Sequence, residues 1–171
     1  HGGESTEGLI DEAIRHCITK MSHLHFTSTE SYRQRVIQLG ESPNRVFNFG
    51  ALGIDNIKRL ELLSQPQLEK SIGMQLGERN LLITFHPVTL ENDTARAQFQ
   101  ALLDAICGLE KTKFVFTKAN SDTGGRIVNQ MIDEFVRTNS NKAVAFDSLG
   151  QLRYLSSLQY VDAVVGNSSS G

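Results

Sequence analysis

The sequence has no long hydrophobic run, little excess charge of either sign and only two cysteines. Its longest apolar runs, such as residues 81–85, are far shorter than the roughly 20 residues of a membrane-spanning helix, so no membrane partner is expected. Cys17 and Cys107 lie far apart on predicted helices. We therefore expect two buried free thiols rather than a disulfide, and a cytoplasmic protein.

Charged residues of both signs are mixed along the chain. Lys and Arg total 17 against 19 Asp and Glu, which gives a formal net charge of -2. Without a basic stripe or an acidic tail, no nucleic-acid partner is expected. Any anionic ligand has to be held by local geometry, because the overall field does not attract it. The length of 171 residues suits one domain or two small ones.

Hydrophobic periodicity predicts helices alternating with short strands. The predicted helices cover residues 6–22, 30–38, 60–74, 92–109, 125–138 and 152–160, and the predicted strands cover residues 24–27, 45–49, 81–85, 114–117, 143–146 and 163–165. Strands that are apolar on both faces and alternate with helices indicate an α/β fold with a parallel sheet covered on both sides. A composition shift near residues 50–57 suggests a hinge between two lobes, at residues 1–50 and 51–171.

Two predicted strand ends carry small or polar residues, where parallel α/β sheets bind their ligands. These ends are Phe85-His86-Pro87 and Val165-Gly166-Asn167-Ser168. Small residues, hydroxyl groups and the N–H groups of a following helix suit a diphosphate, although a turn with an N-capping serine explains the second end as well. His86 could bond or protonate a phosphate oxygen, and a structural histidine remains open there.

A third polar group lies near the start of the chain. Asp11 and Arg15 are four residues apart on a predicted helix, so they can pair as a surface salt bridge worth less than about 1 kcal/mol. Glu4, on a Gly-Gly loop just ahead, adds a second carboxylate, and neighbouring carboxylates can serve as proton acid and proton base. No metal is expected, because the histidines lack companion ligands at metal spacing.

Taken together, these motifs resemble the hydrolysing UDP-N-acetylglucosamine 2-epimerases, the branch that supplies N-acetylmannosamine for sialic acid synthesis. The matching segments are His1-Gly2-Gly3-Glu4, residues 10–20, Phe85-His86-Pro87-Val88-Thr89, Asn120-Ser121-Asp122 and residues 166–171. The resemblance covers essentially the whole chain, as an internal fragment of the family's sequence. The order and spacing of the segments make it specific.

This resemblance implies two Rossmann-like lobes of the glycosyltransferase-B type, both truncated, with the active site in the cleft between them. Residues 1–50 would end the N-terminal lobe, and residues 51–171 would form an incomplete C-terminal, UDP-binding lobe. The implied catalytic residues are Glu4, Asp11 and His86, and the implied substrate-binding residues are Arg15, Asn120, Ser148, Leu149, Gly166, Asn167, Ser168 and Ser169. Contact residues outside this stretch are also implied, so the fragment alone could be inactive.

The implied reaction removes UDP from the sugar, passes through a glycal and adds water, without a cofactor. The full-length protein is expected to be a homo-oligomer that takes a UDP-sugar substrate. Three alternatives stay open: the related hydrolysing epimerase for a UDP-diacetamido-trideoxy sugar, a B-type glycosyltransferase, and a non-catalytic UDP-sugar sensor. A glycosyltransferase would be expected to carry a Glu-x7-Glu nucleotide pattern, and a sensor would tolerate loss of Glu4 and Asp11.

Overall fold

The computed structural model describes residues 3–4, 10–87, 94–120 and 123–167, without the side chains of residues 10, 11 and 123. It divides into two compact units, unit 1 (His1–Leu60) and unit 2 (Glu61–Gly171). The assignment of these units to the lobes predicted at residues 1–50 and 51–171 stays a prediction. None of the described helices is long and apolar enough to cross a membrane.

Unit 1 is a small parallel β-α-β arrangement preceded by a helix. Its elements are α1 (Ile10–Met21), β1 (His25–Thr27), α2 (Glu30–Gln38), a short 3-10 helix (Pro43–Arg45), β2 (Val46–Asn48) and α3 (Leu52–Arg59). Helix α2 packs against both strands and covers the face on which His25 and Thr27 are buried. Its N-cap is Thr29, whose hydroxyl accepts a hydrogen bond from the Tyr32 N–H.

The other face of the two-stranded sheet is aromatic and exposed. Phe26 lies opposite Phe47 in the strand register, and with Phe49 they form a stack with ring centroids 5.8–6.0 Å apart. Their exposed fractions are 51%, 37% and 74%. A parallel sheet usually buries both faces, and among the described residues of unit 1 helix α2 covers only one of them.

Unit 2 is a three-layer α/β/α fold built on one parallel sheet. Its elements are α4 (Gln65–Ile72), β3 (Arg79–Thr84), α5 (Ala95–Cys107), β4 (Thr112–Thr117), α6 (Thr123–Thr138), β5 (Ala143–Phe146), α7 (Gly150–Ser157) and β6 (Ala163–Gly166). The strand order is β5-β4-β3-β6, and all three pairings are parallel. The predicted parallel sheet is confirmed.

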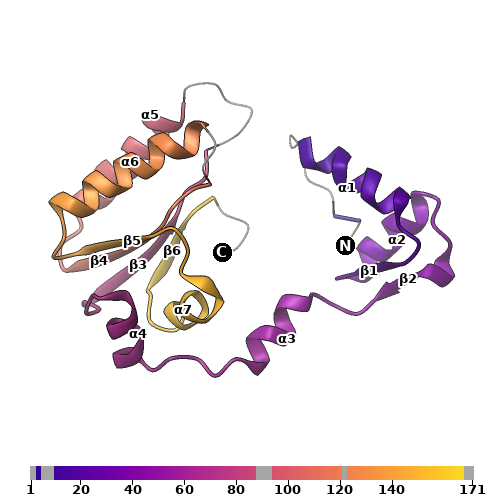
Figure 1. Cartoon of the computed structure of the whole chain (residues 1–171), viewed down its shortest axis with the longest axis horizontal. Helices are drawn as coiled ribbons and strands as arrows, with labels where there is room; N and C mark the ends of the chain where they lie inside the picture. The colour runs from indigo at the N-terminus through magenta and orange to yellow at the C-terminus, as the bar shows by residue number, and fades with distance from the viewer. Residues whose placement is uncertain (1–2, 5–9, 88–93, 121–122, 168–171) are drawn as a thin grey trace. The chain divides into compact units, whose positions relative to one another are not determined.

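Successive residues of the central strands face opposite layers, as the period of two requires. Ile83 and Phe116 belong to a buried cluster with residues of α5 and α6, whereas Leu82 and Val115 belong to a second cluster with residues of α4 and α7. Figure 1 shows α5 and α6 on one face of the sheet and α4 and α7 on the other. The prediction that helices cover both faces is therefore confirmed.

Helix α3 lies in the segment near which a hinge is predicted, and the hinge stays a prediction. Two details of the sequence interpretation are wrong, and the first is that residues 60–64 precede α4 instead of belonging to it. The reason is a capping box, in which the Ser64 N–H donates to Gln67 Oε1 and Pro66 lies in the first turn. Both cysteines are free, as predicted, but they are exposed rather than buried.

Candidate functional site

The strand order of unit 2 creates a topological switch point at the carboxyl ends of β3 and β6. The chain passes from β3 to β4 and then β5 in one direction, and β6 returns to the opposite side of β3. Connections on the two sides of β3 therefore diverge, and open α/β sheets bind their ligands outside the strand ends at such a point. His86 follows β3, and Asn167 follows β6.

The Asn167 carboxamide joins these two strand ends directly. The backbone N–H of His86 donates to Asn167 Oδ1 at 2.8 Å, and Asn167 Nδ2 donates to the backbone carbonyl of His86 at 2.7 Å. The paired bonds fix the backbone of the half-buried His86 beyond the last ladder pair, Thr84 with Gly166. The structure thus brings together the two strand ends that the sequence singles out.

Gly166 makes the close approach of β6 to β3 possible. Its φ is +151°, and a Cβ at this position would lie 1.7 Å from the backbone oxygen of Thr84. No side chain fits that space, so packing alone requires glycine here. The predicted contact of Gly166 with a diphosphate stays a prediction. Ser168 and Ser169, the other predicted phosphate contacts of this loop, lie outside the described residues.

A second carboxamide holds the loop after β4. The buried Ala119 donates its N–H to Asn129 Oδ1 at 2.8 Å and accepts from Asn129 Nδ2 at 3.0 Å. This fixes the backbone immediately before the exposed Asn120. The first turn of α6 also lies close to the β3 loop, because a Cβ on Gly124 would lie 2.9 Å from Pro87 Cβ. The loops after β3 and β4 are therefore neighbours.

Lys118, the first residue after β4, is held by ion pairs with Asp133 and Asp147. Lys118 Nζ lies 2.8 Å from Asp133 Oδ1 and 3.6 Å from Asp147 Oδ1. Its hydrogen bond to Asp133, together with the negative charges of Asp133 and Asp147, raises the pKa of the Lys118 ammonium group. The ammonium stays charged at neutral pH and links the β4 end to α6 and to the β5 end.

The β5 end presents Ser148 and Leu149 in different ways. The Leu149 side chain is buried in the cluster between the sheet and the helices α4 and α7, so a ligand can contact only its backbone. The Ser148 hydroxyl accepts a hydrogen bond from the Gly150 N–H at 3.1 Å, which forms a local turn. Arg153 Nε donates to the Leu149 carbonyl at 2.8 Å. The predicted nucleotide contacts of both residues stay predictions.

In unit 1, the structure describes only part of the predicted acidic group. Glu4 is half-buried, and Asp11 lies in the first turn of α1 with its side chain outside the description. Arg15 Nη2 forms an ion pair with Glu12 Oε2, and His16 Nε2 lies 3.0 Å from the other oxygen of that carboxylate. Sequence reasoning missed Glu12, although the spacing of three and four residues was the signal for it.

An ionic cluster of Lys20, Glu41 and His25, in which only His25 is buried, ties α1 to the strand that follows it. Glu41 Oε1 accepts from Lys20 Nζ at 2.5 Å, and its Oε2 lies 3.2 Å from Nε2 of the buried His25. The hydrogen bond from Lys20 lowers the pKa of the Glu41 carboxyl. Within the described residues, no group of three or more His, Cys, Asp and Glu side chains has the arrangement of a metal site.

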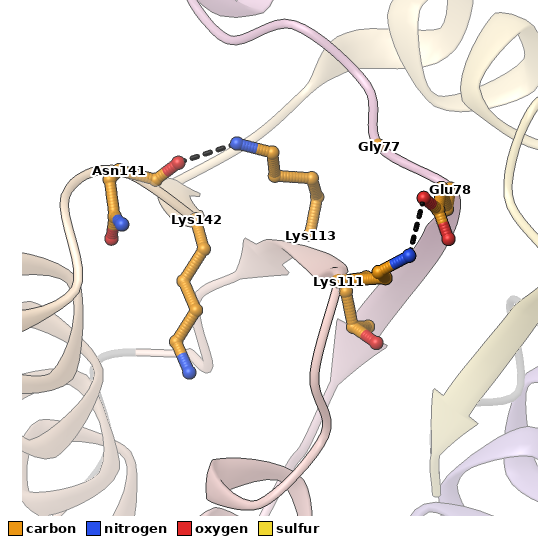
Figure 2. A pocket seen from close by; sticks show the side chains of 7 residues that line it. Gly77, Glu78, Lys111, Lys113, Asn141 and Lys142 are labelled. Atoms are coloured by element: carbon orange, nitrogen blue, oxygen red, sulfur yellow. Dashed lines mark hydrogen bonds and ion pairs between the residues drawn. The ribbon is translucent and has the colours of Figure 1, made fainter.

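A shallow pocket of about 290 Å³ lies at the opposite, amino-terminal edge of the unit 2 sheet (Figure 2). Its ammonium groups point in different directions and have partners: Lys111 Nζ lies 3.0 Å from Glu78 Oε1, and Lys113 Nζ donates to the Asn141 carbonyl at 2.6 Å. The alkyl stems of the lysines, rather than converging charges, line the hollow. This pocket is separate from the strand ends that carry the candidate site.

Comparison with known proteins assigns the chain to a family. The family model for UDP-N-acetylglucosamine 2-epimerase matches residues 1–171. The chain is 45% identical over 170 residues to the GDP/UDP-N,N'-diacetylbacillosamine 2-epimerase (hydrolyzing) of Campylobacter jejuni, covering 99% of this chain and 44% of that protein. It is 42% identical over 172 residues to polysialic acid biosynthesis protein P7 of Escherichia coli, covering 100% of this chain and 43% of that protein.

The fold agrees with a solved member of the same family. The crystal structure of UDP-GlcNAc 2-epimerase from Neisseria meningitidis bound to UDP-GlcNAc matches 98% of this chain and 47% of that chain, with a TM-score of 0.73 and 15% identity. This likeness confirms the predicted α/β fold of the glycosyltransferase-B type. The chain spans less than half the length of each of these three proteins. The match over all 171 residues shows that the chain belongs to the UDP-N-acetylglucosamine 2-epimerase family.

Proposed function

We propose that the full-length protein is a hydrolysing 2-epimerase that converts UDP-N-acetylglucosamine into N-acetylmannosamine and UDP. The observation that carries this proposal is the pair of hydrogen bonds between the Asn167 carboxamide and the His86 backbone. These bonds join two strand ends at the switch point of the sheet, in a chain that belongs to the UDP-N-acetylglucosamine 2-epimerase family. The two similar sequences support the hydrolysing branch and a role in sialic acid biosynthesis, because one is named as hydrolysing and the other for polysialic acid. A homo-oligomeric cytoplasmic enzyme is part of the same proposal.

The strand ends of unit 2 are proposed to bind UDP. A diphosphate needs hydrogen-bond donors held in place, and the carboxamide of Asn167 holds His86 by its backbone, which leaves the imidazole for a phosphate oxygen. Gly166 keeps the β6 end close to β3, and Ser168 and Ser169 are assigned to the phosphates. Asn120 and Ser148, with the backbone of Leu149, are assigned to the nucleotide because they follow the neighbouring strands β4 and β5.

The carboxylates Glu4 and Asp11 are proposed to transfer the protons at the sugar. One carboxylate takes the proton from C2, the C2–H electrons form the C1–C2 double bond, and UDP leaves C1 with the electrons of the C1–O bond. Water then adds across the glycal, with hydroxyl at C1 and a proton at C2 on the opposite face. Arg15, which pairs with Glu12, supplies positive charge on the same helix. The net reaction is a redox-neutral hydrolysis.

A second substrate is favoured by one specific comparison. The 45% identity to a diacetylbacillosamine 2-epimerase is of the same order as the 42% identity to the polysialic acid protein. A UDP-diacetamido-trideoxy sugar differs from UDP-N-acetylglucosamine in the groups at C4 and C6, whereas the chemistry at C1 and C2 is the same. The residues assigned to UDP and to C2 therefore serve either substrate.

The substrate is decided by supplying both UDP-sugars to the full-length protein and following each product by proton NMR. We expect free UDP with N-acetylmannosamine from UDP-N-acetylglucosamine, at a higher kcat/KM than with the diacetamido sugar. Higher kcat/KM for the diacetamido sugar would assign the enzyme to that branch. Formation of UDP-N-acetylmannosamine alone would contradict hydrolysis, and UDP-sugar binding without turnover would indicate a sensor.

A further inference from the structure

The Gly3 backbone lies directly on helix α2, next to the proposed catalytic Glu4. Gly3 is buried with φ +82°, and a Cβ on it would lie 2.2 Å from the backbone oxygen of Tyr32 and 2.7 Å from its Cα. Only a hydrogen atom fits between the two backbones, and only glycine adopts this φ without strain. The turn that carries Glu4 is therefore packed onto α2 at one defined point.

Arg35 completes this attachment. Its Nη1 donates a hydrogen bond to the Gly3 carbonyl at 3.1 Å, and its guanidinium carbon lies 5.6 Å from the ring centroid of Tyr32. Tyr32 and Arg35 are three residues apart, so they share one face of α2. Arg35 itself is exposed, but the carbonyl that it binds belongs to a buried residue, where the loss of a hydrogen-bond partner is costly.

The bond to the Gly3 carbonyl constrains Glu4 through the covalent geometry of the chain. The peptide group is planar, so fixing the carbonyl oxygen of Gly3 fixes the plane that ends at the Cα of Glu4. We propose that Arg35 is a positioning residue, which holds the Glu4 carboxylate for proton transfer by fixing the Gly3–Glu4 peptide against Tyr32. This inference rests on the proposed function, because it takes Glu4 as a proton-transfer group.

Positioning and mere structural support differ in what they do to the kinetics. A carboxylate displaced by about 1 Å from its working position can lower turnover by about 100-fold, while binding made elsewhere on the substrate is retained. Loss of Arg35 should therefore lower kcat and leave KM nearly unchanged. A purely structural role would lower the amount of folded enzyme without altering kcat per folded molecule.

Arg33 offers a matched control on the same helix. Its Nε donates to the backbone carbonyl of Val46 at 2.9 Å, which is the same kind of bond on a carbonyl remote in sequence from Glu4. The test uses the full-length enzyme with the substitutions Arg35→Gln, Arg35→Lys, Arg33→Gln and Glu4→Gln. Circular dichroism and thermal melting establish the folded fraction of each variant, and steady-state kinetics with UDP-N-acetylglucosamine give kcat and KM.

We expect Arg35→Gln to lower kcat at least about tenfold with KM changed less than about twofold. Arg35→Lys should recover part of the loss, because its ammonium can still donate to the Gly3 carbonyl, and Arg33→Gln should keep the kcat of the parent enzyme. Equal kcat per folded molecule in Arg35→Gln and Arg33→Gln would overturn the inference. If Arg35→Gln does not fold, Arg35→Lys carries the same comparison.

The Glu4→Gln arm separates this inference from the proposed function. Loss of turnover in Glu4→Gln with unchanged kcat in both Arg35 variants would reject the positioning role and leave the proposed function standing. Parent-level turnover in Glu4→Gln would show that Glu4 is not a proton-transfer group. The positioning role of Arg35 would then be rejected as well.

Discussion

The carboxamide of Asn167 bridges the backbone N–H and carbonyl of His86, at 2.8 and 2.7 Å. The regular pairing of β3 with β6 ends at Thr84 and Gly166. Beyond that pair, the Asn167 side chain makes the hydrogen bonds to the β3 strand end that a backbone would make if the ladder continued. A similar bridge stands at the other end of β3, where Asn80 Oδ1 accepts from the Gly77 N–H at 2.8 Å and Asn80 Nδ2 donates to its carbonyl at 3.2 Å.

The two bridges give a matched pair of substitutions. Asn167→Ala should raise the Kd for UDP about tenfold, because His86 loses its fixed position, and lower the unfolding free energy by about 1 kcal/mol. Asn80→Ala, at the opposite end of the same strand, should destabilise the fold by about 1–3 kcal/mol and leave UDP binding unchanged. Calorimetric titration of UDP into both variants checks this. Equal Kd values in the two variants would contradict the role assigned to the strand ends.

Gly166 should be intolerant of any side chain. In Gly166→Ala the new Cβ would stand 1.7 Å from the Thr84 oxygen, so β6 has to move away from β3. We expect a loss of about 2–3 kcal/mol in the free energy of unfolding, measured by urea denaturation followed by circular dichroism. Gly108→Ala is the control, because nothing lies within 4 Å of a Cβ there. Its stability should stay within about 0.5 kcal/mol of the parent, and a similar loss in both would refute the packing argument.

The Glu41 cluster should make unit 1 sensitive to acid. The hydrogen bond from Lys20 lowers the folded-state pKa of Glu41 below 4.5, the value for an unperturbed carboxyl. The stabilisation is therefore present above about pH 4.5 and is lost as the pH falls through the folded-state pKa. The Tm difference between the parent and Glu41→Gln should shrink from pH 7 towards pH 3. Lys20→Met should flatten the profile in the same way, and a difference independent of pH would be inconsistent with this ion pair.

The proposed carboxylates should separate chemistry from nucleotide binding. Glu4→Ala and Asp11→Ala are expected to abolish release of N-acetylmannosamine and to keep the Kd for UDP within about threefold of the parent value. Turnover is measured by the release of UDP, and binding is measured by calorimetry on the same preparations. Substantial residual turnover in either variant would remove that carboxylate from the mechanism. Loss of UDP binding in both would mean that they act in binding instead.

The sequence predicts most of unit 2 because its strands are short apolar runs with clear helices between them. It also places His86 and Asn167 at strand ends, since each follows such a run. The bridge between these residues could not be predicted, because it depends on β6 lying beside β3 and not beside β5. Sequence neighbours do not reveal which strands become neighbours in the sheet.

Unit 1 and the segment after it were harder to predict for physical reasons. Helix α3 begins at Leu52 without a side-chain cap and contains Gly53, so its helix signals are weak. Cys17 and Cys107 were expected to be buried because free cysteine is usually a buried residue type, but both are exposed. Their exposure depends on which face of each helix packs against the rest of the unit, and residue type does not reveal this. Arg15 contacts Glu12, a carboxylate that the sequence interpretation did not single out, while its predicted pairing with Asp11 involves a side chain outside the description.

Proton NMR of the sugar product formed in D2O tests the central claim most directly. If the full-length protein eliminates UDP and hydrates a glycal, N-acetylmannosamine should carry deuterium at C2 in every molecule, because the C2 proton leaves with the carboxylate and solvent supplies its replacement. Retention of the original proton at C2, or a product still attached to UDP, would contradict the account.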